Sequence, residues 1–240
     1  MKHLVFRSIA VAAVALLAFG SSAANAALVT AYIDLGDRDN DLNTGLHGGA
    51  YWTTIDSNGT TATLTDSATD AALAWTLGVT NVEGDSPNSV GPTVPASHIF
   101  TTSDAATDGL WNRPSGIDQR LVVTIWALDA SGAETYDLSL YGNRSNSDDA
   151  AAIFEVKGAG ALISSGTIAQ GNTTGTNTPW DVAGVQADGS GQIVIELATP
   201  SGVDLSILSA MSITAIPEPS TIALAGLGLL GLAAVRRRAQ

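Results

Sequence analysis

Leu121-Val122-Val123-Thr124-Ile125-Trp126-Ala127-Leu128 is a continuous run of apolar and β-branched residues without a charge. A run of this length and composition is typical of a central β-strand covered on both faces, so we expect Trp126 in the core. Two further segments, Thr135–Tyr141 and Gln192–Leu197, place apolar residues at every second position. A period of two is that of a half-buried strand. The three segments together predict a β-sheet fold.

Seven other segments have the same character: Leu28–Ile33, Tyr51–Ile55, Thr60–Thr65, Leu73–Val79, Ile153–Val156, Leu162–Ile168 and Ile207–Thr214. Glycine- and asparagine-containing turns separate them. Glu83–Pro95 holds three prolines and cannot be a central strand, and Gly171–Pro179 is expected to be a loop. About ten short strands without a convincing amphipathic helix predict an all-β, antiparallel sandwich, most readily a jelly roll.

The N-terminus has the three parts of a signal peptide. Lys2 and Arg7 supply positive charge, residues 9–19 form an apolar stretch, and Ala24 and Ala26 are the small residues of the cleavage signal, with cleavage expected after Ala26. We therefore expect residues 1–26 to direct export through the Sec machinery. A short buried helix is the alternative, but it would not need its charges at one end and its small residues at the other.

The C-terminus combines a short motif, an apolar run and a basic tail. The run Thr221–Val235 has fifteen residues, and as a helix it would span about 22 Å, less than the ~30 Å hydrocarbon core. Marginal insertion suits a temporary transmembrane helix, although a buried core helix is an alternative. The positive-inside rule places the tail in the cytoplasm. The parts, in chain order, are Pro217, Glu218, Pro219, Ser220, the run, and Arg236, Arg237 and Arg238.

This arrangement resembles the PEP-CTERM sorting signal of Gram-negative bacteria. The resemblance implies recognition by an exosortase, a membrane protease or transpeptidase, and an association with exopolysaccharide and biofilm matrix. The protein would pass transiently through the inner membrane and reach the cell surface or matrix. Proline holds the preceding residue extended, so Pro219 would present Glu218 to a protease. The expected domains are a signal peptide (1–26), a sandwich (27–215) and a sorting segment (216–240).

The region between the two targeting segments is strongly acidic. It has five basic and 22 acidic side chains, a net charge of −17, which argues against nucleic acid as a partner. The chain has no cysteine, which excludes disulfides and thiolate chemistry. Stability must therefore come from the core.

A second resemblance supports the fold. Tyr136-x-Leu138-x-Leu140-Tyr141-Gly142-x-Arg144-Ser145 is similar to a strand found in exported β-sandwiches of galactose-binding-like type. The segment Val185–Ile195 resembles a hairpin of the same proteins, although Ala187 stands where proline is usual. The resemblance implies a galactose-binding-like sandwich rather than any particular activity.

Asp37, Asp39 and Asp41 are the candidate ligands for a metal ion. Alternate carboxylates in a loop can converge on Ca²⁺, and Asp34 and Asn43 could add oxygens. A solvated acidic loop is the competing interpretation. No cofactor is expected other than this structural calcium.

Tryptophan points to sugar binding, because its ring can stack on a sugar. Trp111 with Arg113 and Trp180 with Asp181 lie in loop-like contexts and are the candidate ligand-binding residues. Tryptophans that close the end of a sandwich would look the same in sequence. His47 and His98 are the histidines of the central region, and no nucleophile motif accompanies them.

These observations favour a non-enzymatic surface or matrix protein and no catalytic residue. A carbohydrate-binding module that engages the matrix polysaccharide is the alternative. A secreted hydrolase is a weaker one, and a cleft holding a histidine beside a carboxylate would favour it.

Overall fold

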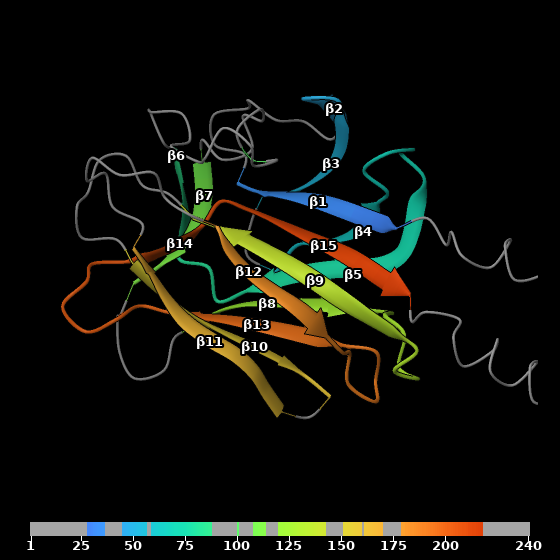
Figure 1. Cartoon of the computed structure of the whole chain (residues 1–240). Coiled ribbons are helices and arrows are strands. Elements are labelled where there is room, and N and C mark those ends of the chain that lie inside the picture. Colours follow the sequence, from blue (N-terminus) through green and yellow to red (C-terminus); the bar gives the residue numbers. More distant parts are fainter. Residues whose placement is uncertain are drawn as a thin grey trace, which may run out of the picture. The chain divides into compact units, whose positions relative to one another are not determined.

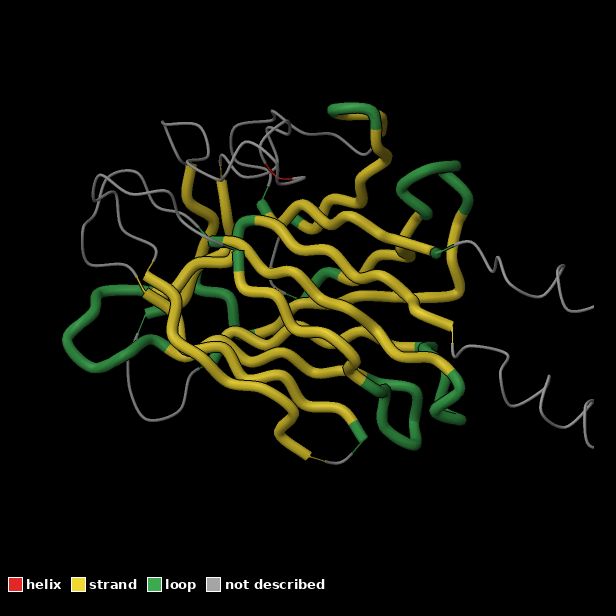
Figure 2. The backbone as a smooth tube through the Cα atoms, in the orientation of Figure 1, coloured by secondary structure: helices red, strands yellow, loops and turns green. Residues whose placement is uncertain are grey.

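The computed structural model describes residues 28–36, 45–56, 59–87, 100, 108–113, 120–142, 151–159, 161–169 and 179–217. A compact unit, Val29–Ile216, contains two six-stranded sheets that pack as a sandwich (Figures 1 and 2). In the described part of the chain, no helix is long and apolar enough to cross a membrane. The expected signal peptide and the apolar run Thr221–Val235 lie outside the described residues.

The first sheet has the order β12 (Trp180–Val185), β9 (Glu134–Tyr141), β15 (Ala210–Pro217), β1 (Val29–Leu35), β3 (Ala50–Ile55) and β2 (Gly45–His47). The second has the order β11 (Ala161–Ala169), β10 (Ala151–Gly158), β13 (Ile193–Ala198), β8 (Leu121–Trp126), β5 (Ala72–Thr80) and β4 (Thr61–Thr65). A small third sheet comprises β14 (Ser206–Leu208), β7 (Asp108–Asn112) and β6 (Gly84–Pro87).

The core lies between the two large sheets and follows the period of two. In β8 and β13, residues alternate between buried and half-buried positions along the whole strand. In β9, Tyr136, Leu138 and Leu140 point inward, as the alternation predicts. Each fully buried leucine or isoleucine contributes roughly 1.5–3 kcal/mol, so these rows supply most of the stability.

The ten predicted strand segments are confirmed as strands, with one correction inside β8. Trp126 is not in the core but half-buried on the outer face of the second sheet. A Cβ at Gly78 would lie 2.8 Å from its ring, so the indole covers the backbone of the neighbouring β5. The continuous apolar run predicted burial on both faces, whereas the strand periodicity leaves every second residue outside the core.

Four strands were not expected: β2, β6, β7 and β12. The last predicted segment, Ile207–Thr214, is two strands, because the strand is interrupted at Ser209. The Ser209 backbone makes hydrogen bonds to two neighbouring segments. The Ser209 N–H donates to the Tyr141 carbonyl and its own carbonyl accepts from the Leu35 N–H, both at 2.8 Å. The pairing is also not wholly antiparallel, since β1 and β3 run parallel.

A buried tyrosine anchors the connection from β8 to β9. The Tyr136 hydroxyl accepts the Asp129 N–H at 2.8 Å and donates to Glu134 Oε2 at 3.0 Å. Its ring meets the edge of Trp75 with centroids 5.8 Å apart. Burial raises the pKa of Tyr136 to about 12, so its hydroxyl remains a donor throughout the neutral range.

Gly158, at the end of β10, allows the segment between β12 and β13 to approach the β10 backbone closely. A Cβ there would lie 2.1 Å from the Gln186 carbonyl oxygen. Gly158→Ala should therefore lower the free energy of unfolding by about 1–3 kcal/mol, as overpacked sites do. Gly189→Ala is the matched control, because nothing lies within 4 Å of a Cβ at that position. Equal denaturant midpoints for the two variants would contradict the close approach.

Candidate functional site

Trp111 and Arg113 lie together in and beside the small third sheet. The Trp111 ring is half-buried against Leu205 and Ile207, and a Cβ at Gly84 would lie 2.7 Å from it. The exposed guanidinium of Arg113 stacks over the ring, with its carbon 4.8 Å from the centroid. Such a cation–π contact contributes about 0.5–1 kcal/mol at an exposed site. A sugar could stack on this face of the ring only by displacing Arg113.

Trp180 and Asp181 are consecutive residues of β12 and point to opposite faces, because strand residues alternate. The Trp180 ring packs on Phe154 of the second sheet, with centroids 5.4 Å apart. Asp181 is exposed and accepts a hydrogen bond from Ser139 Oγ at 2.6 Å. The structure therefore does not bring this tryptophan and this carboxylate into one site. Trp180 packs on the main core and Trp111 on the small sheet, so the two rings belong to different clusters.

An aromatic cluster that the sequence analysis missed covers part of the outer face of the first sheet. Tyr32 and Trp52 are paired across β1 and β3, with ring centroids 5.1 Å apart. Phe100 lies 6.3 Å from Trp52 and 5.8 Å from Tyr141. Burial raises the pKa of Tyr32, and a hydrogen bond with the Ser67 side chain only partly offsets this. The sequence did contain a signal for Tyr32. Because it lies between the inward-facing residues Ala31 and Ile33 of one strand, its side chain must face outward.

Asp34 lies on the same outer face, two residues beyond Tyr32. Its carboxylate is buried, and Thr54 Oγ1 donates to its Oδ2 at 3.4 Å. The predicted calcium ligands Asp37, Asp39 and Asp41 lie outside the described residues. Within the described residues, no three His, Asp or Glu side chains converge on a point where a metal ion could bind. Of the two histidines of the central region, His98 lies outside the described residues and His47 is placed by its backbone on β2.

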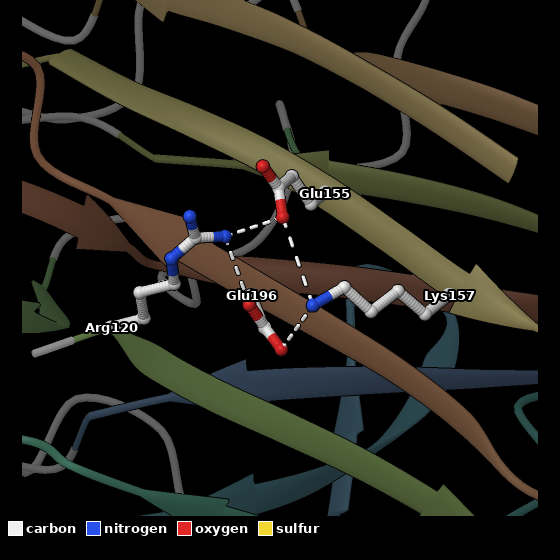
Figure 3. Close-up of polar contacts among 4 residues, drawn as sticks. All are labelled: Arg120, Glu155, Lys157 and Glu196. Carbon is white, nitrogen blue, oxygen red and sulfur yellow. Dashed lines mark hydrogen bonds and ion pairs between the residues drawn. The ribbon is translucent and has the colours of Figure 1, made fainter. Parts of the chain in front are cut away.

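Four charged side chains form a network on the outer face of the second sheet (Figure 3). Glu155 of β10 and Glu196 of β13 are directly opposite each other, an arrangement that would be repulsive alone. Arg120 donates to both carboxylates, with 2.9 Å to Glu196. The Lys157 ammonium donates to Glu196 and lies 3.7 Å from Glu155.

The two cations control the ionisation of Glu196. Burial opposes its negative charge, but the hydrogen bonds and charges of Lys157 and Arg120 outweigh burial and hold its pKa below the ordinary value. All three basic side chains in the described residues are thus engaged, Arg120 and Lys157 here and Arg113 on Trp111. The network is balanced in charge and stabilises strand pairing rather than forming an acid–base pair.

The predicted sorting residues begin where the last strand ends. Pro217 is the final residue of β15, and Ala215 of that strand is paired with Val29 at the start of β1. Both ends of the sandwich therefore lie side by side at one end of the first sheet. Outside the described residues lie Ala24, Ala26, Glu218, Pro219, Ser220, Arg236, Arg237 and Arg238.

Comparison with known proteins identifies the C-terminal segment. Residues 215–238 match the family described as the PEP-CTERM protein-sorting motif. This motif marks exported proteins that an exosortase processes, so the chain carries the sorting signal of an exported, surface-directed protein. No curated protein matches the chain.

Among solved structures, a similar chain is the enzymatically active domain of tailspike protein 4 from bacteriophage CBA120. The two are 14% identical, and the match covers 60% of this chain and 19% of the tailspike chain. Its TM-score is 0.26, so it assigns neither fold nor function.

Lys157→Gln tests the charge network. Removing one cation should lower the free energy of unfolding at neutral pH by about 1 kcal/mol or less, because the groups are partly exposed. Since the folded-state pKa of Glu196 is depressed, its contribution is present above its unfolded pKa and is lost as pH falls through the folded value. The difference between wild type and variant in urea unfolding should therefore vanish in acid.

Arg113→Gln is the control, because it removes the same charge at a site without a carboxylate among its described contacts. A stability difference for Lys157→Gln that is independent of pH would contradict the electrostatic role of the network.

Proposed function

We propose that this chain is a non-enzymatic protein of the cell surface or extracellular matrix, and that its sandwich is the part that functions outside the cell. The proposal rests on the sorting match at residues 215–238, because a sorting motif indicates where the chain is sent and implies no catalytic activity. The mature domain would begin after Ala26 and extend to about residue 215, with residues 216–240 serving only for sorting. An exosortase-type enzyme, the Sec machinery and an exopolysaccharide are the proposed partners.

The position of the motif on the fold supports processing at this point. β15 pairs with β1 along six residues, and the motif follows without an intervening linker. Cleavage after Pro217 would remove none of the paired residues of the sandwich. Because Val29 lies opposite Ala215, both targeting segments would also leave from the same end of the domain.

We also propose that the sandwich is of the galactose-binding-like, jelly-roll type. The two segments on which that resemblance rests are strand β9 and the passage from β12 into β13. They contribute buried residues to both sheets, including Tyr136, Val185 and Ile195. The parallel pairing of β1 with β3 is a departure that such an assignment must accommodate.

Glu218→Gln tests the sorting proposal in the native host. Intact mass should show that the wild-type protein lacks the residues beyond the motif and leaves the membrane fraction. The variant should keep its C-terminus and stay in the inner membrane. Glu83→Gln, on the exposed surface of the sandwich, is the matched control and should be sorted normally. An intact C-terminus in the wild-type protein, retained in the inner membrane, would replace the matrix role with a tethered domain.

Binding of matrix polysaccharide is a second candidate function, because the exposed guanidinium of Arg113, held over the half-buried ring of Trp111, could donate hydrogen bonds to a sugar. Arg113→Ala should reduce co-sedimentation with exopolysaccharide extracted from the host several-fold. Lys157→Gln removes the same charge elsewhere and should bind as the wild type does. An equal loss in both variants would show a general effect of charge and would remove the candidate site.

A further inference from the structure

Strand β11 forms one edge of the second sheet. On one side it pairs with β10, and among the described residues no strand pairs with its other side. An edge strand presents unpaired N–H and C=O groups that can bind another strand. Natural proteins usually block such edges by shortening them, inserting bulges or placing charges on them.

The other three edges of the sandwich are blocked in these ways. β2 has three residues, and β4 has five with a register shift between Thr63 and Thr65. β12 has a register shift between Val182 and Val185, where Gly184 adopts a left-handed φ of 71°. β12 also carries the exposed charge of Asp181.

β11 lacks these features along most of its length. Ser164–Ala169 pairs residue for residue with Ala151–Val156, and the register shift is confined to the start of the strand. Gly158–Trp180 is a run of 23 residues without a charged side chain, the longest in the sandwich domain. Leu162 and Ile163 are among the exposed large hydrophobic residues, with 55% and 39% of their surface accessible. The regular part of this edge, from Ser164 onward, is uncharged, and the exposed apolar side chains lie at its shifted start. An uncharged edge of regular pairing is the type that accepts a further strand.

We propose that β11 is a self-assembly edge, at which two copies of the chain pair antiparallel about a two-fold axis. The absence of charge on β11 favours a second copy as the partner. The domain carries a net charge of −17, so two copies repel each other except where they approach along an uncharged segment. A two-fold arrangement lets one edge complement itself, and it would join the second sheets of two copies into one. The proposal goes beyond the proposed function and does not depend on how the C-terminus is processed.

A single-cysteine scan tests the pairing in the full exported chain, which has no cysteine of its own. Leu162, Ile163, Ser164, Ser165 and Thr167 are each replaced by Cys. Copies are trapped by oxidation or by a short bis-maleimide and scored as dimer on non-reducing gels. Facing Cα atoms of an antiparallel pair are about 4.5–5.5 Å apart, within the range of a disulfide. Thr63→Cys, exposed on the opposite edge strand β4, is the matched control.

The expected result is a maximum of crosslinking at one β11 position that falls on both sides, since only the residue at the axis faces its own copy. Adding Thr167→Lys to the best variant, or Ser165→Lys where the best variant is Thr167→Cys, should reduce the dimer at least tenfold, whereas Thr63→Lys should not. Crosslinking at β11 that is no greater than at Thr63→Cys would overturn the proposal. Equal yields at all β11 positions would indicate parallel, in-register stacking and would also overturn the two-fold pairing.

Discussion

The fold depends on one contact, the apolar interface between the inward-facing rows of the two large sheets. Ile33 and Leu138 of the first sheet, and Val123 and Ile195 of the second, are fully or almost fully buried in this single cluster. No disulfide supports it, because the chain has no cysteine. The same domain carries a net charge of −17, which opposes compaction by self-repulsion. Burial of the alternating rows must outweigh both the chain entropy and this repulsion, so the remaining features are arranged to protect the pairing of these strands.

The scarcity of cations shapes the surface. With five basic side chains against 22 acidic ones, most carboxylates have no cation to pair with. Two of the five bracket Glu155 and Glu196, where adjacent strands would otherwise place like charges face to face. Other carboxylates are used within turns: Asp129 accepts from the backbone and hydroxyl of Ser131, and the hydrogen bonds of Ser131 hold its pKa below the ordinary value. Acidic residues thus form turns where hydrogen bonds can replace counter-charges.

Period-two patterns predicted the strands well because the physical cause is local: a strand facing one core must alternate. The unexpected strands β7 and β12 have contexts rich in Gly, Asn and Pro, and only pairing with distant segments makes them strands. Trp126 shows the reverse error, because an unbroken apolar run can mean an outer face bearing one large side chain rather than burial on both sides. At the candidate site, Arg113 was expected from proximity in sequence to be a polar partner beside a Trp111 platform, whereas in the structure it stacks over the Trp111 ring. The cluster of Tyr32, Trp52, Phe100 and Tyr141 joins four distant segments and required the fold.

The connection between sorting and assembly depends on where the first and last strands lie. β1 begins opposite the end of β15, and both are interior strands of the first sheet, so neither of them forms a lateral edge of the sandwich. β11 is such a lateral edge, at the far side of the second sheet from β4. A weak edge contact that is negligible in dilute solution becomes effective when copies are held at one surface, because confinement raises their local concentration. An edge strand without charges in a strongly acidic domain is therefore consistent with association where copies are crowded. The negative charge of the remaining surface opposes association elsewhere.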